Sequence, residues 1–129
     1  LLARRPLDED VLAGCLSLFG QCSDPQDLST VRQYLTHPTW FIRVQAATAL
    51  GKMGVEEDEG HLIGLLGDSH WWVRYRAAEA LSILPSMTED KLSILVQTLP
   101  TTESRKVLTP FVAKRFEESL AHTSGLSAA

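Results

Sequence analysis

The chain has 129 residues, of which 44% are hydrophobic and 22% are charged, and its formal net charge at pH 7 is −4. This length accommodates one domain or a short run of stacked units, and the composition is that of a soluble globular protein rather than a disordered one. The negative charge opposes non-specific binding to nucleic acid, and no apolar run approaches the roughly 18 to 20 residues that a membrane-spanning helix needs.

Helical periodicity dominates the sequence, because apolar residues recur at helical spacing while no long stretch alternates as a half-buried strand would. Three helices are expected in the first part of the chain, over 8–19, 24–36 and 37–54. Aspartate or histidine followed by proline opens the second and the third, and glycines follow the apolar runs as stop signals. Two more helices are expected over 57–66 and 68–84.

The last part of the chain predicts a helix over 88–99, where a threonine cap and two acids precede the apolar run. Another helix begins at Thr102, but residues 109–110 are threonine followed by proline, which is the signature of a new helix start. We therefore expect a short turn and a kink there, then a last helix to about His122, and a flexible tail over 123–129.

The two cysteines, Cys15 and Cys22, form neither a CxxC motif nor a Cys/His ligand array. We expect ordinary reduced thiols, with a disulfide or a redox role as the alternative. Reduced thiols favour a reducing compartment, so the expected location is cytoplasmic or facing the cytoplasm. Since the sequence begins with Leu1, we also interpret the chain as the C-terminal part of a larger protein.

An internal repeat with a period of 31 residues connects two segments of the chain. The stretch "HPTWFIRVQAATAL", residues 37–50, superposes on "DSHWWVRYRAAEAL", residues 68–81. The shared positions are an aromatic pair, a branched apolar residue, an arginine and a set of alanines ending in leucine: Trp40 with Trp71, Phe41 with Trp72, Ile42 with Val73, Arg43 with Arg74, Ala46 and Ala47 with Ala77 and Ala78, and Ala49 and Leu50 with Ala80 and Leu81. Agreement at this many positions indicates a repeated structural unit.

Each unit is a helix, a turn and a second helix, and neither helix can bury its apolar stripe without neighbours. The sequence therefore predicts an all-α fold, an α-solenoid of stacked antiparallel helix pairs in which small alanines let the second helices approach closely. We expect a single domain over 1–122 with degenerate capping helices at both ends. Its parts are a partial repeat, two full repeats and a capping unit, over 7–20, 24–54, 57–84 and 88–122.

The stretch "LLGDSHWWVRYRAAEAL", residues 65–81, resembles the HEAT repeat, and in particular the short bacterial type that phycobiliprotein lyase subunits share. The second helix of this type reads Asp, a few variable positions, Val-Arg, then Ala-x-x-Ala-Leu. The matching residues are Asp68, Val73, Arg74, Ala77, Ala80 and Leu81. The resemblance implies a bacterial protein with an α-solenoid fold.

The resemblance also implies a structural role for Asp68, Arg43 and Arg74, whose charge-assisted hydrogen bonds would hold the turns and adjacent repeats together. Ligand binding by these residues is the alternative. The earlier copy of the motif has His37 where the family usually has aspartate. A histidine cannot act as a permanent anion in that position.

The two aromatic pairs and their neighbours are the candidate partner-binding site. Helical geometry places the pairs in the first turn of their helices, at one rim of the stack. Aromatic and arginine side chains are enriched among the residues that dominate binding energy. The candidate residues are Trp40, Phe41, Trp71, Trp72, Tyr75 and Arg76. The alternative is that one member of each pair is buried as a wedge between repeats.

No catalytic or metal-binding constellation is found in the sequence. The four histidines are scattered, and there is no HExxH motif, no Gly-rich phosphate loop and no His-Glu pair of the kind that carries iron in the HEAT-like hydroxylases. The acidic run over 56–59 is expected to complement a helix dipole. The basic stretch over 105–116 is expected to be a solvated face, with an acidic partner or a lipid surface as the alternative. We expect no catalytic residue, no metal and no cofactor.

The expected function is a non-enzymatic interaction or scaffolding module that binds another protein, without binding nucleic acid or inserting into a membrane. Two alternatives come from the resemblance. A bilin-handling subunit of the phycobiliprotein-lyase type would need a groove of chromophore size. A DNA-binding module of the HEAT-like glycosylase type would need a basic concave face, which the net charge of −4 opposes.

Overall fold

The computed structural model describes residues 11–12, 14–16 and 25–128, and the regular structure within them is entirely helical. The helices are α2 (Pro25–Gln33), which continues into the 3₁₀ turn η1 (Tyr34–Thr36), α3 (Trp40–Met53), α4 (Asp58–Leu65), α5 (Trp71–Ile83), α6 (Glu89–Thr98) and α7 (Thr102–Ala128). Residues 11, 12 and 14–16 are also helical, and the rest of the helix expected over 8–19 lies outside the described residues.

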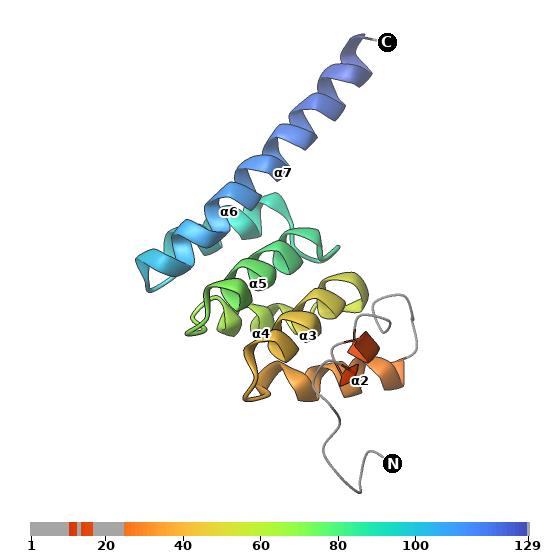
Figure 1. Ribbon diagram of the computed structural model, residues 1–129. Helices are drawn as coiled ribbons and strands as arrows, with labels where there is room; N and C mark the ends of the chain where they lie inside the picture. The colour runs from red at the N-terminus through yellow and green to blue at the C-terminus, as the bar shows by residue number, and fades with distance from the viewer. Residues whose placement is uncertain (1–10, 13, 17–24, 129) are drawn as a thin grey trace, which may run out of the picture.

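The helices stack in two layers (Figure 1). Helices α3, α5 and α7 lie side by side in one layer, while α2, α4 and α6 form the other, each packed on the longer helix that follows it. The core lies between the layers and consists of leucine, valine, isoleucine and alanine side chains from both. The described chain is therefore an all-helical repeat of stacked pairs.

The repeat continues into the third pair, where the sequence motif is hard to recognise. Helices α3, α5 and α7 begin at Trp40, Trp71 and Thr102, so each start lies 31 residues after the previous one (71 − 40 and 102 − 71). The arginine position also recurs, because Arg105 follows Arg74 by the same interval (105 − 74 = 31). The helical register is thus kept while most of the motif residues are replaced.

Small residues bring α3 and α5 into close contact, as the alanine pattern predicts. A Cβ atom added at Gly51 would lie 2.8 Å from both the Cα and the Cβ of Ala80. The alanines facing this junction, Ala46, Ala47 and Ala77, are fully buried. The junction leaves no room for even one additional methyl group without separating the two helices.

Helices α3 and α5 begin later than expected, because the residues before them form a side-chain-capped turn. The backbone N–H of Thr39 donates to Nδ1 of His37 at 3.0 Å, and that of His70 donates to Oδ1 of Asp68 at 2.9 Å. A side chain that accepts from the residue two positions ahead competes with helical geometry. The helices therefore begin at Trp40 and Trp71.

The turn expected at residues 109–110 is absent, and α7 is one helix from Thr102 to Ala128 with Pro110 inside it. The expected helix end at His122 is likewise wrong, because the helix continues through most of the segment predicted as a tail. Leu108 is fully buried on the core just before the proline, and Phe111 packs against the core just after it. Burial on both sides outweighs the roughly 3 kcal/mol that an interior proline costs a helix.

Candidate functional site

Arg43 and Asp68 form a two-pronged ion pair between adjacent repeats. Arg43 donates from Nε to Oδ2 of Asp68 at 2.9 Å and from Nη2 to Oδ1 at 3.0 Å. The side chains are only 14% and 10% exposed. The third arginine nitrogen, Nη1, donates to the carbonyl oxygens of His37 at 2.8 Å and Pro38 at 3.1 Å. The pair therefore ties the turn before α3 to the turn before α5.

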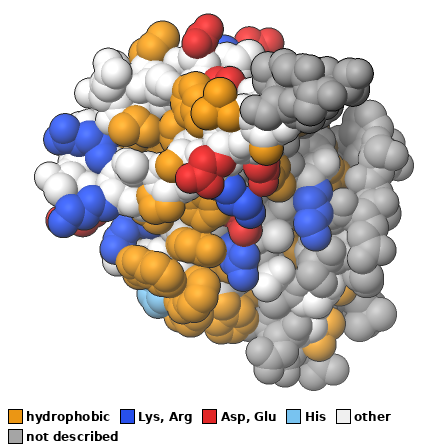
Figure 2. All heavy atoms as spheres, turned by 90° about the horizontal axis from the view of Figure 1, so that it is seen from above, with side chains coloured by type: hydrophobic (Ala, Val, Ile, Leu, Met, Phe, Trp, Pro, Cys, Tyr) orange, Lys and Arg blue, Asp and Glu red, His pale blue; other side chains and the backbone are white. Residues whose placement is uncertain are grey.

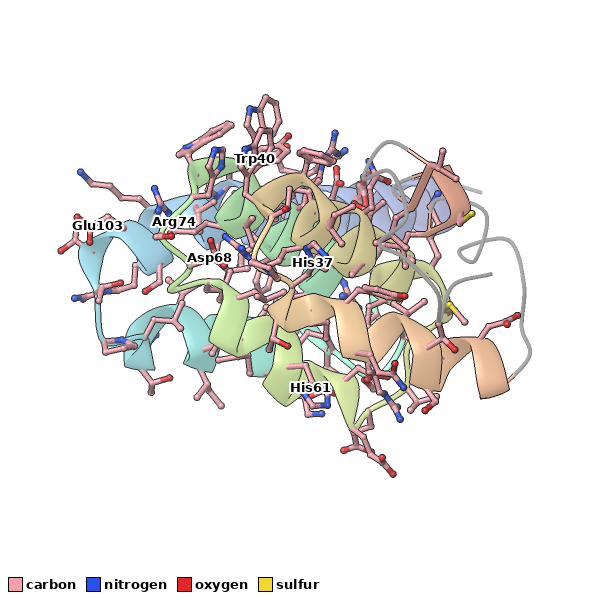
Figure 3. The ribbon with its side chains drawn as sticks, turned by 60° about the horizontal axis from the view of Figure 1, so that its bottom comes forward. His37, Trp40, His61, Asp68, Arg74 and Glu103 are labelled. Atoms are coloured by element: carbon pink, nitrogen blue, oxygen red, sulfur yellow. The ribbon has the colours of Figure 1, made fainter. Side chains whose placement is uncertain are left out.

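Arg74 repeats part of this arrangement one unit later, since its Nη1 donates to the carbonyl oxygen of Asp68 at 2.8 Å. Figure 3 shows Arg74 and Asp68 close together beside His37. The structural role implied for these arginines thus corresponds to contacts that both make with the turns of the stack.

His37 takes over one of the two tasks of the aspartate it replaces. Its Nδ1 accepts the N–H of Thr39, as Oδ1 of Asp68 accepts that of His70. The other task, binding an arginine of the preceding unit, does not arise, because the residue 31 positions before Arg43 is Leu12 (43 − 31 = 12). A permanent anion at residue 37 would have no arginine to bind at that ladder position.

A second ion pair, which the sequence reading missed, joins Arg32 of α2 to Asp58 of α4. Arg32 donates from Nε at 2.6 Å and from Nη2 at 3.0 Å, and the backbone N–H of Val55 adds a third hydrogen bond to this fully buried carboxylate. The hydrogen bond to Asp58 raises the pKa of Arg32 above its ordinary value. Helical spacing gave a signal, because Asp58 shares a buried stripe with Leu62 and Leu66.

Glu59 forms a third link, between α4 and the start of α6. Its carboxylate accepts from the Ser86 hydroxyl at 2.6 Å and from the Lys91 ammonium at 3.0 and 3.1 Å. Burial alone would raise the pKa of Glu59, but these hydrogen bonds and the ammonium charge outweigh it and lower the pKa. The hydrogen bond to Glu59 in turn raises the pKa of Lys91. Two members of the acidic run therefore link repeats, in addition to lying at a helix start.

The tryptophans of the repeated motif are exposed. Trp40, Trp71 and Trp72 are 39%, 50% and 43% exposed, whereas Phe41 is half-buried against the core. One member of the first pair is therefore partly packed, while both members of the second face solvent. The chain has three tryptophans, and all three lie on this surface.

The exposed rings hold one another in place. Trp40 stacks flat on His70 of the next unit, with centroids 4.0 Å apart and an interplanar angle of 4°. Trp71 stacks on Tyr75 at 5.3 Å, and Trp72 meets Tyr75 edge to face at 5.7 Å. Ring contacts of this kind restrict the rotamers of the side chains involved.

Arg76 and Phe111 complete the surroundings of these rings. The guanidinium carbon of Arg76 lies 5.8 Å from the centre of the Trp72 ring and 5.6 Å from that of Tyr75, and its Nη1 donates to Glu79 at 2.8 Å. Phe111 of α7 meets Tyr75 at 5.2 Å. We call Trp40, His70, Trp71, Trp72, Tyr75 and Arg76 together the aromatic face.

Figure 2 shows hydrophobic side chains gathered on one face of the molecule, with arginine and lysine side chains beside them and a histidine at their edge. In Figure 3, Trp40 projects from one side of the stack while His61 lies on the opposite side. His37 and His70 are both hydrogen-bond acceptors in turns. In the described part of the chain, no three His, Cys, Asp or Glu side chains are grouped as a metal site would require.

The basic stretch expected as a solvated face lies on α7. Arg105, Lys106 and Lys114 are exposed. Arg115 differs, since its Nη1 donates to the carbonyl oxygen of Ser82 at 2.7 Å. This bond satisfies a carbonyl group at the C-terminus of α5, where a cation is also favoured by the helix dipole. Cys15 is exposed and forms no disulfide, whereas Cys22 lies outside the described residues.

A model of the HEAT repeat family matches residues 60–84. The matched segment runs from within α4 to the residue after α5, and it contains Asp68, Arg74 and the Trp71–Trp72 pair. This helix pair is therefore HEAT-like, in agreement with the resemblance in the sequence. No curated protein matches the chain in sequence. None of the helices in the described ranges is long and apolar enough to cross a membrane.

Proposed function

We propose that this chain is part of an α-solenoid of HEAT-like repeats of the short bacterial type, and that it acts as a non-enzymatic scaffold that binds another protein. HEAT repeats are commonly protein-interaction modules. The constant 31-residue spacing of the long helices supports a regular stack. In such a stack the aromatic face forms part of an extended rim made by successive repeats.

The observation that carries this proposal is the exposure of three tryptophans on one rim. Large aromatic rings in water are costly, and a protein retains them where a partner covers them. Trp40, Trp71 and Trp72 are already held by stacking on His70 and Tyr75. A partner that binds these rings therefore loses little side-chain entropy.

The charges beside the rings favour a protein over a nucleic acid. Arg43 is paired with Asp68, and Arg76 is paired with Glu79. Neutralised arginines contribute little to phosphate binding, which depends on the release of counterions by free cations. The bilin-handling alternative would need a deep groove, and the rings of the aromatic face contact one another instead of enclosing a space.

Site-specific crosslinking tests the proposal. A photo-reactive phenylalanine analogue replaces Trp72 in cells, and the matched control carries it at Ile94, which is 61% exposed on α6. The expected result is a crosslinked protein from residue 72 that is absent from residue 94. The partner so identified is then purified and titrated with wild type and with a Trp71→Ala/Trp72→Ala variant.

Removing both rings should weaken binding at least about thirtyfold, because truncating an aromatic hot spot costs roughly 2 kcal/mol or more. Ile94→Ala should leave the affinity unchanged. Crosslinks of equal yield from both positions, or an affinity unaffected by loss of the two tryptophans, would show that the aromatic face is not the binding surface.

A further inference from the structure

The arginines at equivalent positions of the two motif copies differ in their occupation. Nη1 of each donates to the carbonyl oxygen six residues earlier, in His37 for Arg43 and in Asp68 for Arg74, and both bonds measure 2.8 Å. This bond holds the guanidinium beside the turn. Arg43 then uses Nε and Nη2 to bind a carboxylate of the next unit.

The next unit offers Arg74 no such carboxylate. The residue that follows Asp68 by one period is Leu99 (68 + 31 = 99), a nearly buried leucine at the C-terminus of α6. Within the described residues, no hydrogen bond or ion pair involves Nε or Nη2 of Arg74. Arg74 is also only half-buried. Two donors in the geometry of a carboxylate fork therefore remain available at the end of the ladder.

We propose that Arg74 binds an aspartate or glutamate side chain of the protein partner, in the two-pronged geometry that Arg43 uses for Asp68. This inference rests on the proposed function, because the partner docks on the aromatic face. Arg74 lies in the first turn of α5 between Trp71 and Tyr75, so a carboxylate bound there sits at the edge of the rings. The partner is thus expected to combine apolar groups with one acidic residue at a fixed distance from them.

A carboxylate fits this position better than a phosphate group. The planar guanidinium fork matches two carboxylate oxygens, and the Arg43–Asp68 pair shows this match in the same fold environment. A phosphate dianion is usually bound by more than one cation, and the arginines nearest in sequence, Arg43 and Arg76, are already paired with acids. The site is therefore suited to a single negative charge.

Glu103 is the competitor within the chain. It is exposed in the first turn of α7, and Figure 3 shows it on the same side of the stack as Arg74. No ion pair joins the two residues. If Glu103 occupied the fork in solution, Arg74 would be closed to a partner, so the test includes Glu103→Gln.

Random peptides displayed on phage serve as the probe. They are selected against wild type, Arg74→Gln, the Trp71→Ala/Trp72→Ala variant, and Arg105→Gln. Arg105 is the matched control, because it occupies the equivalent ladder position in the third unit and is exposed. Wild type and Arg105→Gln should enrich peptides with an acidic residue at a fixed spacing from apolar ones. Arg74→Gln should enrich the apolar residues without the acid.

The affinity of one selected peptide is then measured with its acidic residue intact and replaced by the amide. Wild type should prefer the acid by about tenfold or more, as expected for charge-assisted hydrogen bonds. Arg74→Gln should not discriminate between the two peptides, and Arg74→Lys should discriminate weakly because an ammonium lacks the fork. The change in the peptide tests the contact on the unaltered protein, so a poorly folded Arg74 variant does not prevent the test.

The outcomes separate the two proposals. Peptides whose binding requires the tryptophans but carries no fixed acid, or whose acid preference survives Arg74→Gln, would overturn the role of Arg74 and leave the aromatic face standing. An acid preference that emerges only in Glu103→Gln would also overturn it, because the fork would then be occupied within the chain. Failure to enrich any tryptophan-dependent peptide would count against the proposed function itself.

Discussion

Replacing Asp68 by alanine should lower the free energy of unfolding by about 3 kcal/mol. The carboxylate accepts two hydrogen bonds from Arg43, at 2.9 and 3.0 Å, and one from the backbone N–H of His70 at 2.9 Å. Water can replace these bonds only poorly, because the two side chains are 14% and 10% exposed. Removing one member of a fully buried pair costs roughly 3–5 kcal/mol, and the residual exposure places this pair at the lower end.

Asp68→Asn retains an acceptor for the N–H of His70 but loses the charge, so it should cost roughly half as much. Urea denaturation followed by circular dichroism measures both values. His37 supplies the matched control, since it accepts one N–H from Thr39 and binds no arginine side chain through its ring. His37→Ala should cost about 1 kcal/mol or less. If Asp68→Ala costs no more than His37→Ala, the interpretation of the Arg43 pair as a link between repeats is wrong.

Two further predictions concern the packing and the charges of the stack. Gly51→Ala should destabilise the protein by about 1 kcal/mol, since a Cβ 2.8 Å from Ala80 overpacks the junction by more than the better helix propensity returns; Gly60→Ala, which meets nothing within 4 Å, should instead stabilise it by about 0.5–1 kcal/mol. Loss of stability in both variants would contradict this account of the helix spacing. Since the pKa of Glu59 is lowered in the fold, its contribution is present above the unfolded value of about 4.3 and is lost as the pH falls through the native value. The stability difference between wild type and Glu59→Gln, measured by urea titration, should therefore shrink below about pH 4, and a difference that stays constant would exclude this contribution.

Most of the helices could be predicted because local signals and tertiary packing agree. The interval of 31 residues, the alanines and the helix stop signals all specify the same stacked pairs. The exception is Pro110, where a helix-start signature lies inside α7. The buried side chains before and after it determine the outcome, and burial depends on neighbours that a local pattern does not contain.

The candidate site was predictable only in part. The repeat located Trp40, Trp71 and Trp72 at equivalent positions, but their exposure depends on what the neighbouring unit places beside them. His70 illustrates this limit, because its ring lies flat against Trp40 of the preceding unit, although the residues are thirty positions apart (70 − 40 = 30). The ion pair of Arg32 with Asp58 was missed because an acid in a first turn has a sufficient local explanation in the helix dipole.

The contacts that hold the repeats in register also position the aromatic face. The Arg43–Asp68 pair fixes the turn before α5, and that turn carries His70, the ring on which Trp40 stacks. The distance between Trp40 and Trp71 is therefore set by the same ladder that stabilises the stack. A break in the ladder at Asp68 should weaken binding of a partner that spans both tryptophans, even though Asp68 itself need not touch that partner. The effect would arise from lost preorganisation, so a partner that contacts Trp71 and Trp72 alone should bind the Asp68 variant with nearly unchanged affinity.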